Sequence, residues 1–152
     1  MALIVGKEYC KVDTNGRIKF PIALKRQLED EECRFVVRES IANSCLELWT
    51  HASFKEEMEF LHSRLRIYDP EERELLDRLS AGNTVELDGS DRLLIPPEQK
   101  PVLGGAKEVV LQGTGRFIEI WDRKTYDEVK RSNSDYAEMA KRLLYRTPEQ
   151  QQ

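Results

Sequence analysis

Asp13-Thr14-Asn15-Gly16-Arg17 recurs 75 residues later as Asp88-Gly89-Ser90-Asp91-Arg92, and a proline stands four residues after each arginine, at Pro21 and Pro96. Apolar residues flank both pentapeptides, Val12 and Ile18 in the first copy and Leu87 and Leu93 in the second. Two such segments in one register indicate a duplicated module.

The duplication extends to the strand-like segments that follow. Cys45-Leu46-Glu47-Leu48-Trp49 matches Phe117-Ile118-Glu119-Ile120-Trp121, and the offset drifts from 75 to 72 residues along the chain. Solenoid repeats run to about 20 to 50 residues, so this longer period indicates two folded units. We place them at residues 1–82 and 83–152, each with the helices that follow it.

The first copy has the pattern of short strands around a turn. Residues 7–12 alternate polar and apolar, Asp13 to Gly16 has turn chemistry, and residues 18–20 continue as a second strand. Pro21 is typical of the first turn of a short helix, which we extend to Leu28. Strands are expected at 34–39 and 45–49, then a helix at 53–66 with Ser53 and Glu56 at capping-box spacing.

The second copy repeats this order after a linking helix that starts at Asp69-Pro70. Leu75, Leu76 and Leu79 give that helix an apolar face for packing between units or subunits, and Gly82 ends it. Strands are expected at 84–87, 92–95, 108–112 and 117–121, with a helical turn at Pro96 and one helical tail over 124–145.

Four short strands and a helical turn, about 45 residues, bury too little apolar surface alone, so the two copies are expected to share one core. The predicted class is α+β, with the copies paired as a pseudo-symmetric barrel and both Asp-to-Arg turns near the same end. Trp49 and Trp121 are expected to anchor this core.

Composition excludes several classes of protein. The 152 residues are 39% hydrophobic, with no apolar run near the roughly 20 residues of a membrane span. Neither histidine stands at metal-ligand spacing from Cys10, Cys33 or Cys45, so we expect buried thiols, no metal and no cofactor. These features are typical of a soluble cytoplasmic protein with no membrane partner and no small-molecule substrate.

The net charge of -4 argues against a nucleic-acid partner, but the distribution of charge favours one. Residues 7–26 carry six basic residues against two acidic ones, while acidic residues gather at 29–32 and 56–74. The repeated motif therefore lies in the basic part of the chain. The basic residues of this segment are Lys7, Lys11, Arg17, Lys19, Lys25 and Arg26.

The chain resembles the MraZ family. The resemblance lies in two units, each made of a strand, an Asp-x-x-x-Arg turn, a second strand and a proline, and each followed by a strand pair that ends in Trp. MraZ proteins are tandem members of the swapped-hairpin, AbrB-like class of bacterial DNA-binding proteins. The resemblance covers nearly the whole chain. It implies a nucleoid-associated transcriptional regulator that forms a ring and binds promoter repeats upstream of the division and cell-wall gene cluster.

The resemblance assigns Asp13, Arg17, Asp88 and Arg92 as motif residues. A glycine usually precedes the motif arginine, as Gly16 does, but Asp91 precedes Arg92. Asp enters the left-handed region with a modest penalty, so the turn can form. A carboxylate beside Arg92 weakens its attraction for phosphate, and we expect Arg17 to contribute more to DNA binding.

Arginine has a fork of donors that can meet guanine O6 and N7 or straddle a phosphate, and the motif Asp can cap the turn or pair with the Arg. Lys7, Lys11, Lys19, Lys25 and Arg26 are expected to contact phosphates of double-stranded DNA. A ring of subunits would bind direct repeats through many weak contacts, with steep salt dependence.

Two other classes remain as alternatives. An enzyme is disfavoured because the sequence has no nucleophile elbow and no Gly-rich phosphate loop. A scaffolding module, in which the shared core serves assembly and the acidic helices bind partners, would form oligomers without retaining DNA.

Overall fold

A computed structural model of the chain describes residues 3–28, 33–133 and 135–147. The acidic run at 29–32 and residues 148–152 lie outside the described residues. The elements in chain order are β1 (Ile4–Lys11), β2 (Arg17–Lys19), α1 (Ile22–Lys25), β3 (Arg34–Glu39), β4 (Leu46–Thr50), α2 (His51–Arg64), α3 (Pro70–Leu79), β5 (Asn83–Glu86), β6 (Arg92–Leu94), η1 (Lys100–Leu103), β7 (Glu108–Gly115), β8 (Ile118–Asp122), α4 (Arg123–Ser132) and α5 (Tyr136–Leu144).

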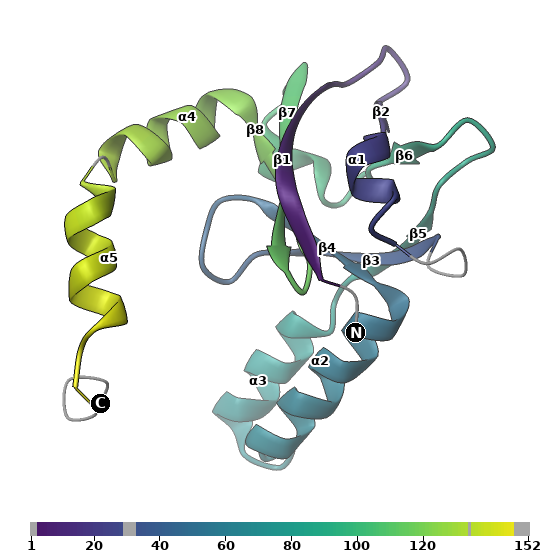
Figure 1. The fold of residues 1–152 in the computed structure, drawn as a ribbon. Coiled ribbons are helices and arrows are strands. Elements are labelled where there is room, and N and C mark those ends of the chain that lie inside the picture. The colour runs from purple at the N-terminus through teal and green to yellow at the C-terminus, as the bar shows by residue number, and fades with distance from the viewer. Residues whose placement is uncertain (1–2, 29–32, 134, 148–152) are drawn as a thin grey trace.

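Strands of the two copies pair with one another. The main sheet has six antiparallel strands in the order β1-β7-β8-β4-β3-β5, and a two-stranded sheet joins β2 to β6. β1 thus lies beside β7 and β3 beside β5, so each copy supplies partners to the other (Figure 1). One apolar cluster contains residues of both copies, including Ile18 and Phe20 with Leu93 and Ile95. The expectation of a shared core is confirmed.

The expected closed barrel is wrong. β1 and β5 are the two edges of the main sheet and do not pair with each other. β2 and β6, three residues each, pair with one another, and Ile18 of β2 also forms a single bridge with Val12. Pro21 and Pro96 follow these strands closely, and proline has no N–H for further pairing. The fold is α+β with an open antiparallel sheet.

Both helical regions begin where a strand ends, and this shifts two expected boundaries. Thr50 caps α2, because its hydroxyl accepts the N–H of Ser53 at 3.1 Å, so the expected capping box at Ser53 is wrong by three residues. The tail is two helices instead of one: α4 ends at Ser132, with Asn133 as its C-cap, and the Asp135 carboxylate caps α5 by accepting the N–H of Glu138 at 3.3 Å.

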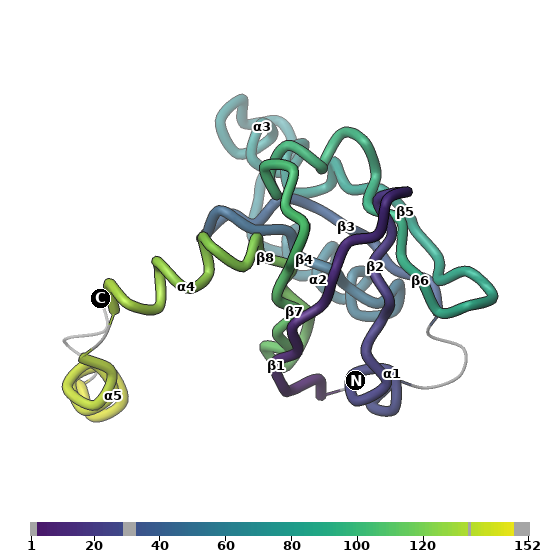
Figure 2. Tube along the Cα trace, turned by 90° about the horizontal axis from the view of Figure 1, so that it is seen from above, coloured from purple at the N-terminus to yellow at the C-terminus, as the bar shows by residue number. Residues whose placement is uncertain are grey.

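The helices after each copy differ in packing. α2 and α3 lie side by side below the sheet, where Leu61, Leu76 and Leu79 are buried together, whereas Leu75 of the predicted apolar face is 44% exposed. α4 leads away from the sheet and α5 stands apart from α2 and α3 in both views (Figures 1 and 2). The second copy thus ends in an arm.

Buried residues confirm some predictions and correct one. Trp49 and Trp121 are both 1% exposed and anchor the core as expected. Cys45 is buried and Cys10 is half-buried. Cys33, which was expected to be buried, is exposed, because it lies just before Arg34, the exposed first residue of β3. In the described part of the chain, none of the helices combines the length and apolar character needed to cross a membrane.

Candidate nucleic-acid interface

Each motif aspartate builds its own turn. The Asp13 carboxylate accepts the N–H groups of Asn15 and Arg17, both at 2.9 Å. Asp88 does the same for Ser90 at 2.8 Å and Arg92 at 3.0 Å. The copies therefore form the same turn, and each turn fixes the backbone from which its arginine extends.

The backbone before each arginine is left-handed. Gly16 has φ of 79° and Asp91 has φ of 58°, so the aspartate occupies the conformation that glycine occupies in the first copy. The expectation that Asp91 would support the turn is confirmed.

The turn hydrogen bonds lower the pKa of both carboxylates. The N–H of Arg17 lowers the pKa of Asp13 below its ordinary value, helped by the N–H of Asn15 and the charge of Arg92. The N–H of Arg92 lowers the pKa of Asp88, helped by Ser90 and then by the charge of Arg17. Each carboxylate can thus cap its own turn and also hold a positive charge.

The two turns are joined by reciprocal ion pairs between copies. Arg17 Nε lies 3.7 Å from Asp88 Oδ2, and Arg92 Nη1 lies 3.0 Å from Asp13 Oδ2. Each aspartate therefore caps its own turn and pairs with the arginine of the other copy. The arginine side chains remain 39% and 47% exposed. We call residues 13–17 and 88–92 together the paired turns.

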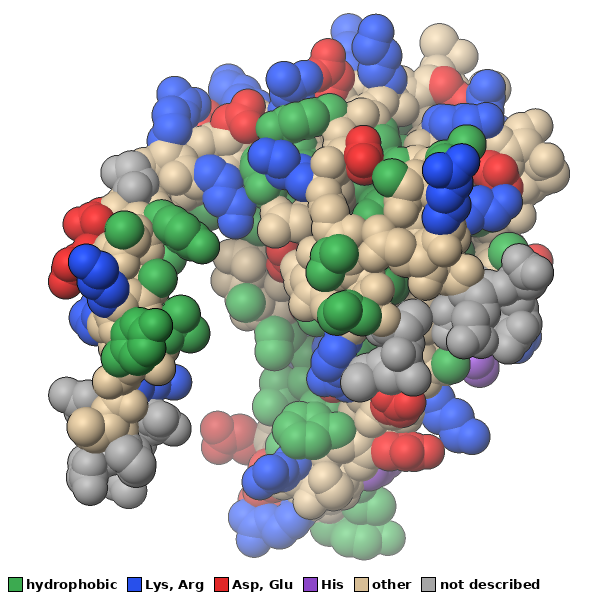
Figure 3. All heavy atoms as spheres, viewed as in Figure 1, with side chains coloured by type: hydrophobic (Ala, Val, Ile, Leu, Met, Phe, Trp, Pro, Cys, Tyr) green, Lys and Arg blue, Asp and Glu red, His purple; other side chains and the backbone are tan. Residues whose placement is uncertain are grey.

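The paired turns project from β2 and β6 on the side of the molecule opposite α5 (Figures 1 and 2). Lys and Arg side chains gather in this region at the upper right of Figure 3, with Asp and Glu between them. The surface thus holds two arginine forks within a mixed but locally basic setting.

Two predicted lysines lie on the paired turns. Lys19 Nζ donates to the Ser90 carbonyl oxygen at 3.2 Å, and Lys25 Nζ lies 2.7 Å from Asp91 Oδ1. Lys100, which was not among the predicted residues, lies against the first turn: a β-carbon on Gly16 would be 3.0 Å from its Nζ. The repeat itself carried the signal for Lys100, because it stands 75 residues after Lys25.

The other predicted basic residues, Lys7, Lys11 and Arg26, make no contact with the paired turns among the described interactions. Lys7 Nζ lies 5.4 Å from the ring centre of Tyr9 and 5.6 Å from that of Tyr126, on the α4 side of the sheet. Lys11 is exposed at the end of β1, opposite Glu108, and Arg26 is exposed at the end of α1.

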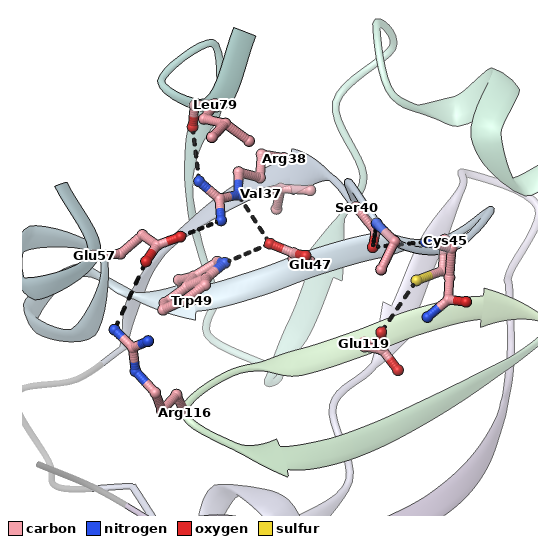
Figure 4. Close-up of polar contacts among 12 residues, drawn as sticks. Val37, Arg38, Ser40, Cys45, Glu47, Trp49, Glu57, Leu79, Arg116 and Glu119 are labelled. Carbon is pink, nitrogen blue, oxygen red and sulfur yellow. Dashed lines mark hydrogen bonds and ion pairs between the residues drawn. The ribbon is translucent and has the colours of Figure 1, made fainter. Parts of the chain in front are cut away.

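A buried charge cluster that the sequence did not predict holds α2 and α3 to the sheet (Figure 4). Arg38 of β3 is 3% exposed and donates to Glu47 at 2.8 Å, to Glu57 at 2.5 Å and to the Leu79 carbonyl oxygen at 2.9 Å. Glu47 also accepts Trp49 Nε1 at 3.0 Å. This one side chain therefore links two strands, α2 and the end of α3.

Comparison with known proteins identifies the family. Over 147 residues, 95% of this chain and 94% of the relative, the sequence is 33% identical to the transcriptional regulator MraZ of Christiangramia forsetii. The chain belongs to the MraZ family. A family model described as "MraZ protein, putative antitoxin-like" matches residues 79–147.

Two further MraZ relatives also match most of the chain. The transcriptional regulator MraZ of Flavobacterium psychrophilum is 32% identical over 147 residues, 95% of this chain and 93% of that protein. The one from Mycoplasmoides gallisepticum is 30% identical over 135 residues, 88% and 91% of the two chains. The MraZ membership predicted from the repeated motif is confirmed along both copies.

Proposed function

We propose that this MraZ-family protein regulates transcription by binding double-stranded DNA with the paired turns. The observation that carries the proposal is the reciprocal pairing of Arg17 with Asp88 and Arg92 with Asp13, which holds two arginines on one exposed surface. Membership of a family whose curated relatives are named transcriptional regulators supports the same role.

The ion pairs leave donors for DNA. A guanidinium has five N–H donors in a rigid fork, and each pair engages one nitrogen of its fork. The remaining donors can meet guanine O6 and N7 in the major groove, while the aspartate holds the direction of the side chain. Orientation before binding lowers the entropy cost of recognition.

Phosphate contacts would position the turns on the duplex. Lys19 beside the second turn and Lys11 just before the first are placed for this role, and Arg26 extends the basic surface along α1. Lys7, which packs on Tyr9 and Tyr126, would add attraction at longer range.

We further propose that residues 1–82 and 83–152 are two AbrB-like units in a swapped-hairpin arrangement. The pairing of β1 with β7, β2 with β6 and β3 with β5 supports it. By the MraZ resemblance, the target is a set of promoter direct repeats upstream of the division and cell-wall gene cluster, and the protein would reside on the nucleoid.

A mobility shift tests the function. The wild-type protein should retain the DNA upstream of its own gene and release it steeply as salt rises, because bound phosphates exchange for counterions. A shuffled DNA of equal length and composition is the control and should be retained at least about tenfold more weakly, the discrimination expected of one good base contact. Equal retention of the two DNAs at every salt concentration would reject sequence-specific regulation.

We propose that the protein assembles into a homo-oligomeric ring through its C-terminal arm. None of the residues of α5 is buried, and Tyr136, Leu144 and Tyr145 are 73%, 74% and 82% exposed. Apolar side chains gather on this helix at the left of Figure 3. Apolar surface of this kind marks an interaction site, and a ring would present many paired turns to repeated DNA.

Changing Leu143 and Leu144 together to glutamate should reduce the particle to monomers or dimers, because the charges would have to be buried at the contact. Light scattering after size exclusion measures the mass. Lys141→Glu changes the charge at an exposed polar position of the same helix and should keep the wild-type mass. A double variant of unchanged mass would exclude α5 from the interface, and assembly without DNA retention would favour scaffolding.

A further inference from the structure

Lys25 and Lys100 occupy equivalent positions in the two copies. They are separated by the same 75 residues as the motifs, and each stands four residues after a proline, Pro21 and Pro96. Each lysine also reaches the turn of the other copy, Lys25 at Asp91 and Lys100 at Gly16. In each case, a lysine of one copy lies beside the residue that precedes the motif arginine of the other copy: Lys25 beside Asp91, and Lys100 beside Gly16.

The two cases differ in one group. In one case, the Asp91 carboxylate lies 2.7 Å from Lys25 Nζ. In the other, Gly16 supplies no carboxylate, and among the described residues the Lys100 side chain has no ion pair or hydrogen bond. The Asp91 carboxylate thus marks where an anion sits beside this lysine, and the first copy leaves that position to an anion from outside the chain.

The surroundings of Lys100 also suit an anion. A groove of about 360 Å³ lies beside the first turn, and its lining includes Lys100 and Lys107 together with the apolar residues Ile18 and Leu103. Asp13, the one carboxylate that lines it, is engaged by the backbone of its own turn and by Arg92. Among the described residues, Lys107 likewise has no ion pair.

We propose that Lys100 binds a backbone phosphate of the DNA beside Arg17, and that Lys25 instead neutralises Asp91 within the protein. This inference rests on the proposed function. The two turns then differ in charge. Beside the first turn, Arg17 and Lys100 can both contact DNA, whereas beside the second turn the charge of Lys25 is balanced by Asp91, which leaves Arg92. The larger contribution expected of Arg17 then follows from Lys100 as well as from Asp91.

Lys100→Gln should weaken binding to the upstream DNA roughly fivefold for each protomer in contact, the upper range for an exposed ion pair. The slope of log affinity against log salt should fall in magnitude by about 0.9 per protomer in contact, the value of one lost phosphate contact. Lys55→Gln removes the same charge from an exposed site on α2 and should leave the slope unchanged. Fluorescence anisotropy across salt measures both quantities.

Asp91→Gly provides the converse test. Glycine suits the left-handed backbone at this position, so the turn should persist. Without the Asp91 carboxylate, the second turn carries one negative charge fewer beside Lys25 and Arg92, so the salt slope should steepen. Adding Lys25→Gln to Asp91→Gly should reverse that change.

The outcomes separate this inference from the proposed function. If Lys100→Gln changes affinity and slope no more than Lys55→Gln, while variants of Arg17 and Arg92 lose DNA, the phosphate role of Lys100 is wrong and the function stands. If the wild-type protein does not distinguish the upstream DNA, the proposed function fails and this inference fails with it.

Discussion

Replacing Arg17 and Arg92 together with alanine will reduce affinity for the upstream DNA at least about a hundredfold, because each bidentate contact to guanine contributes about 1 to 3 kcal/mol. Of the single variants, Arg17→Ala should lose more, because the Lys25–Asp91 pair leaves the second turn less positive than the first. Binding titrations at one fixed salt concentration measure the loss.

The fold should survive these changes. The arginines pair with carboxylates at an exposed surface, where an ion pair contributes about 1 kcal/mol or less. Asp13 and Asp88 would still accept the backbone N–H groups that form the turns. Arg73→Ala removes an arginine paired with Asp77 on α3 and should keep full affinity. A double variant that is folded and binds as tightly as the wild type would show that the paired turns do not read DNA.

Arg38→Met should lower the free energy of unfolding by about 3 to 5 kcal/mol, because it removes the buried cation that pairs with both Glu47 and Glu57. Glu57 retains the longer pair with Arg116 at 3.8 Å, whereas the Leu79 carbonyl oxygen loses the N–H that Arg38 donates to it. Urea unfolding followed by the fluorescence of Trp49 and Trp121 measures the loss at fixed protein concentration, since assembly adds to apparent stability.

Matched variants separate charge from packing at this site. Adding Glu47→Gln and Glu57→Gln to Arg38→Met should recover a large part of the loss, because neutral amides cost less to bury than unpaired carboxylates. Arg78→Met breaks an ion pair with Glu74 that is exposed on α3 and should change stability by less than about 1 kcal/mol. If Arg38→Met behaves like Arg78→Met, the cluster does not hold the helices to the sheet.

Local features of the fold could be predicted because they depend on neighbouring residues. The turn at Asp13 follows from one side chain capping a backbone two and four residues away, and the start of α3 follows from Asp69 before Pro70. Features that depend on distant residues were missed. The main sheet is open because its edge strands β1 and β5 do not pair with each other, which alternation of apolar residues does not determine.

The site was predicted in its components but not in its connections. The repeat identified both arginines, and it showed neither that each pairs with the aspartate of the other copy nor that Lys25 holds Asp91. Those contacts join residues about 66 to 79 positions apart and need the tertiary fold. Arg38 was missed for a related reason, since its burial depends on the packing of α2 and α3 against β3.

The interleaving of strands has a consequence for how the chain matures. Because β1 pairs with β7, β2 with β6 and one side of β3 with β5, these strands of the first half lack those neighbours until the second half has been synthesised. Such long separations slow the search for the native state. Cutting the gene between the copies should therefore yield two pieces that reach the native fold only when they meet.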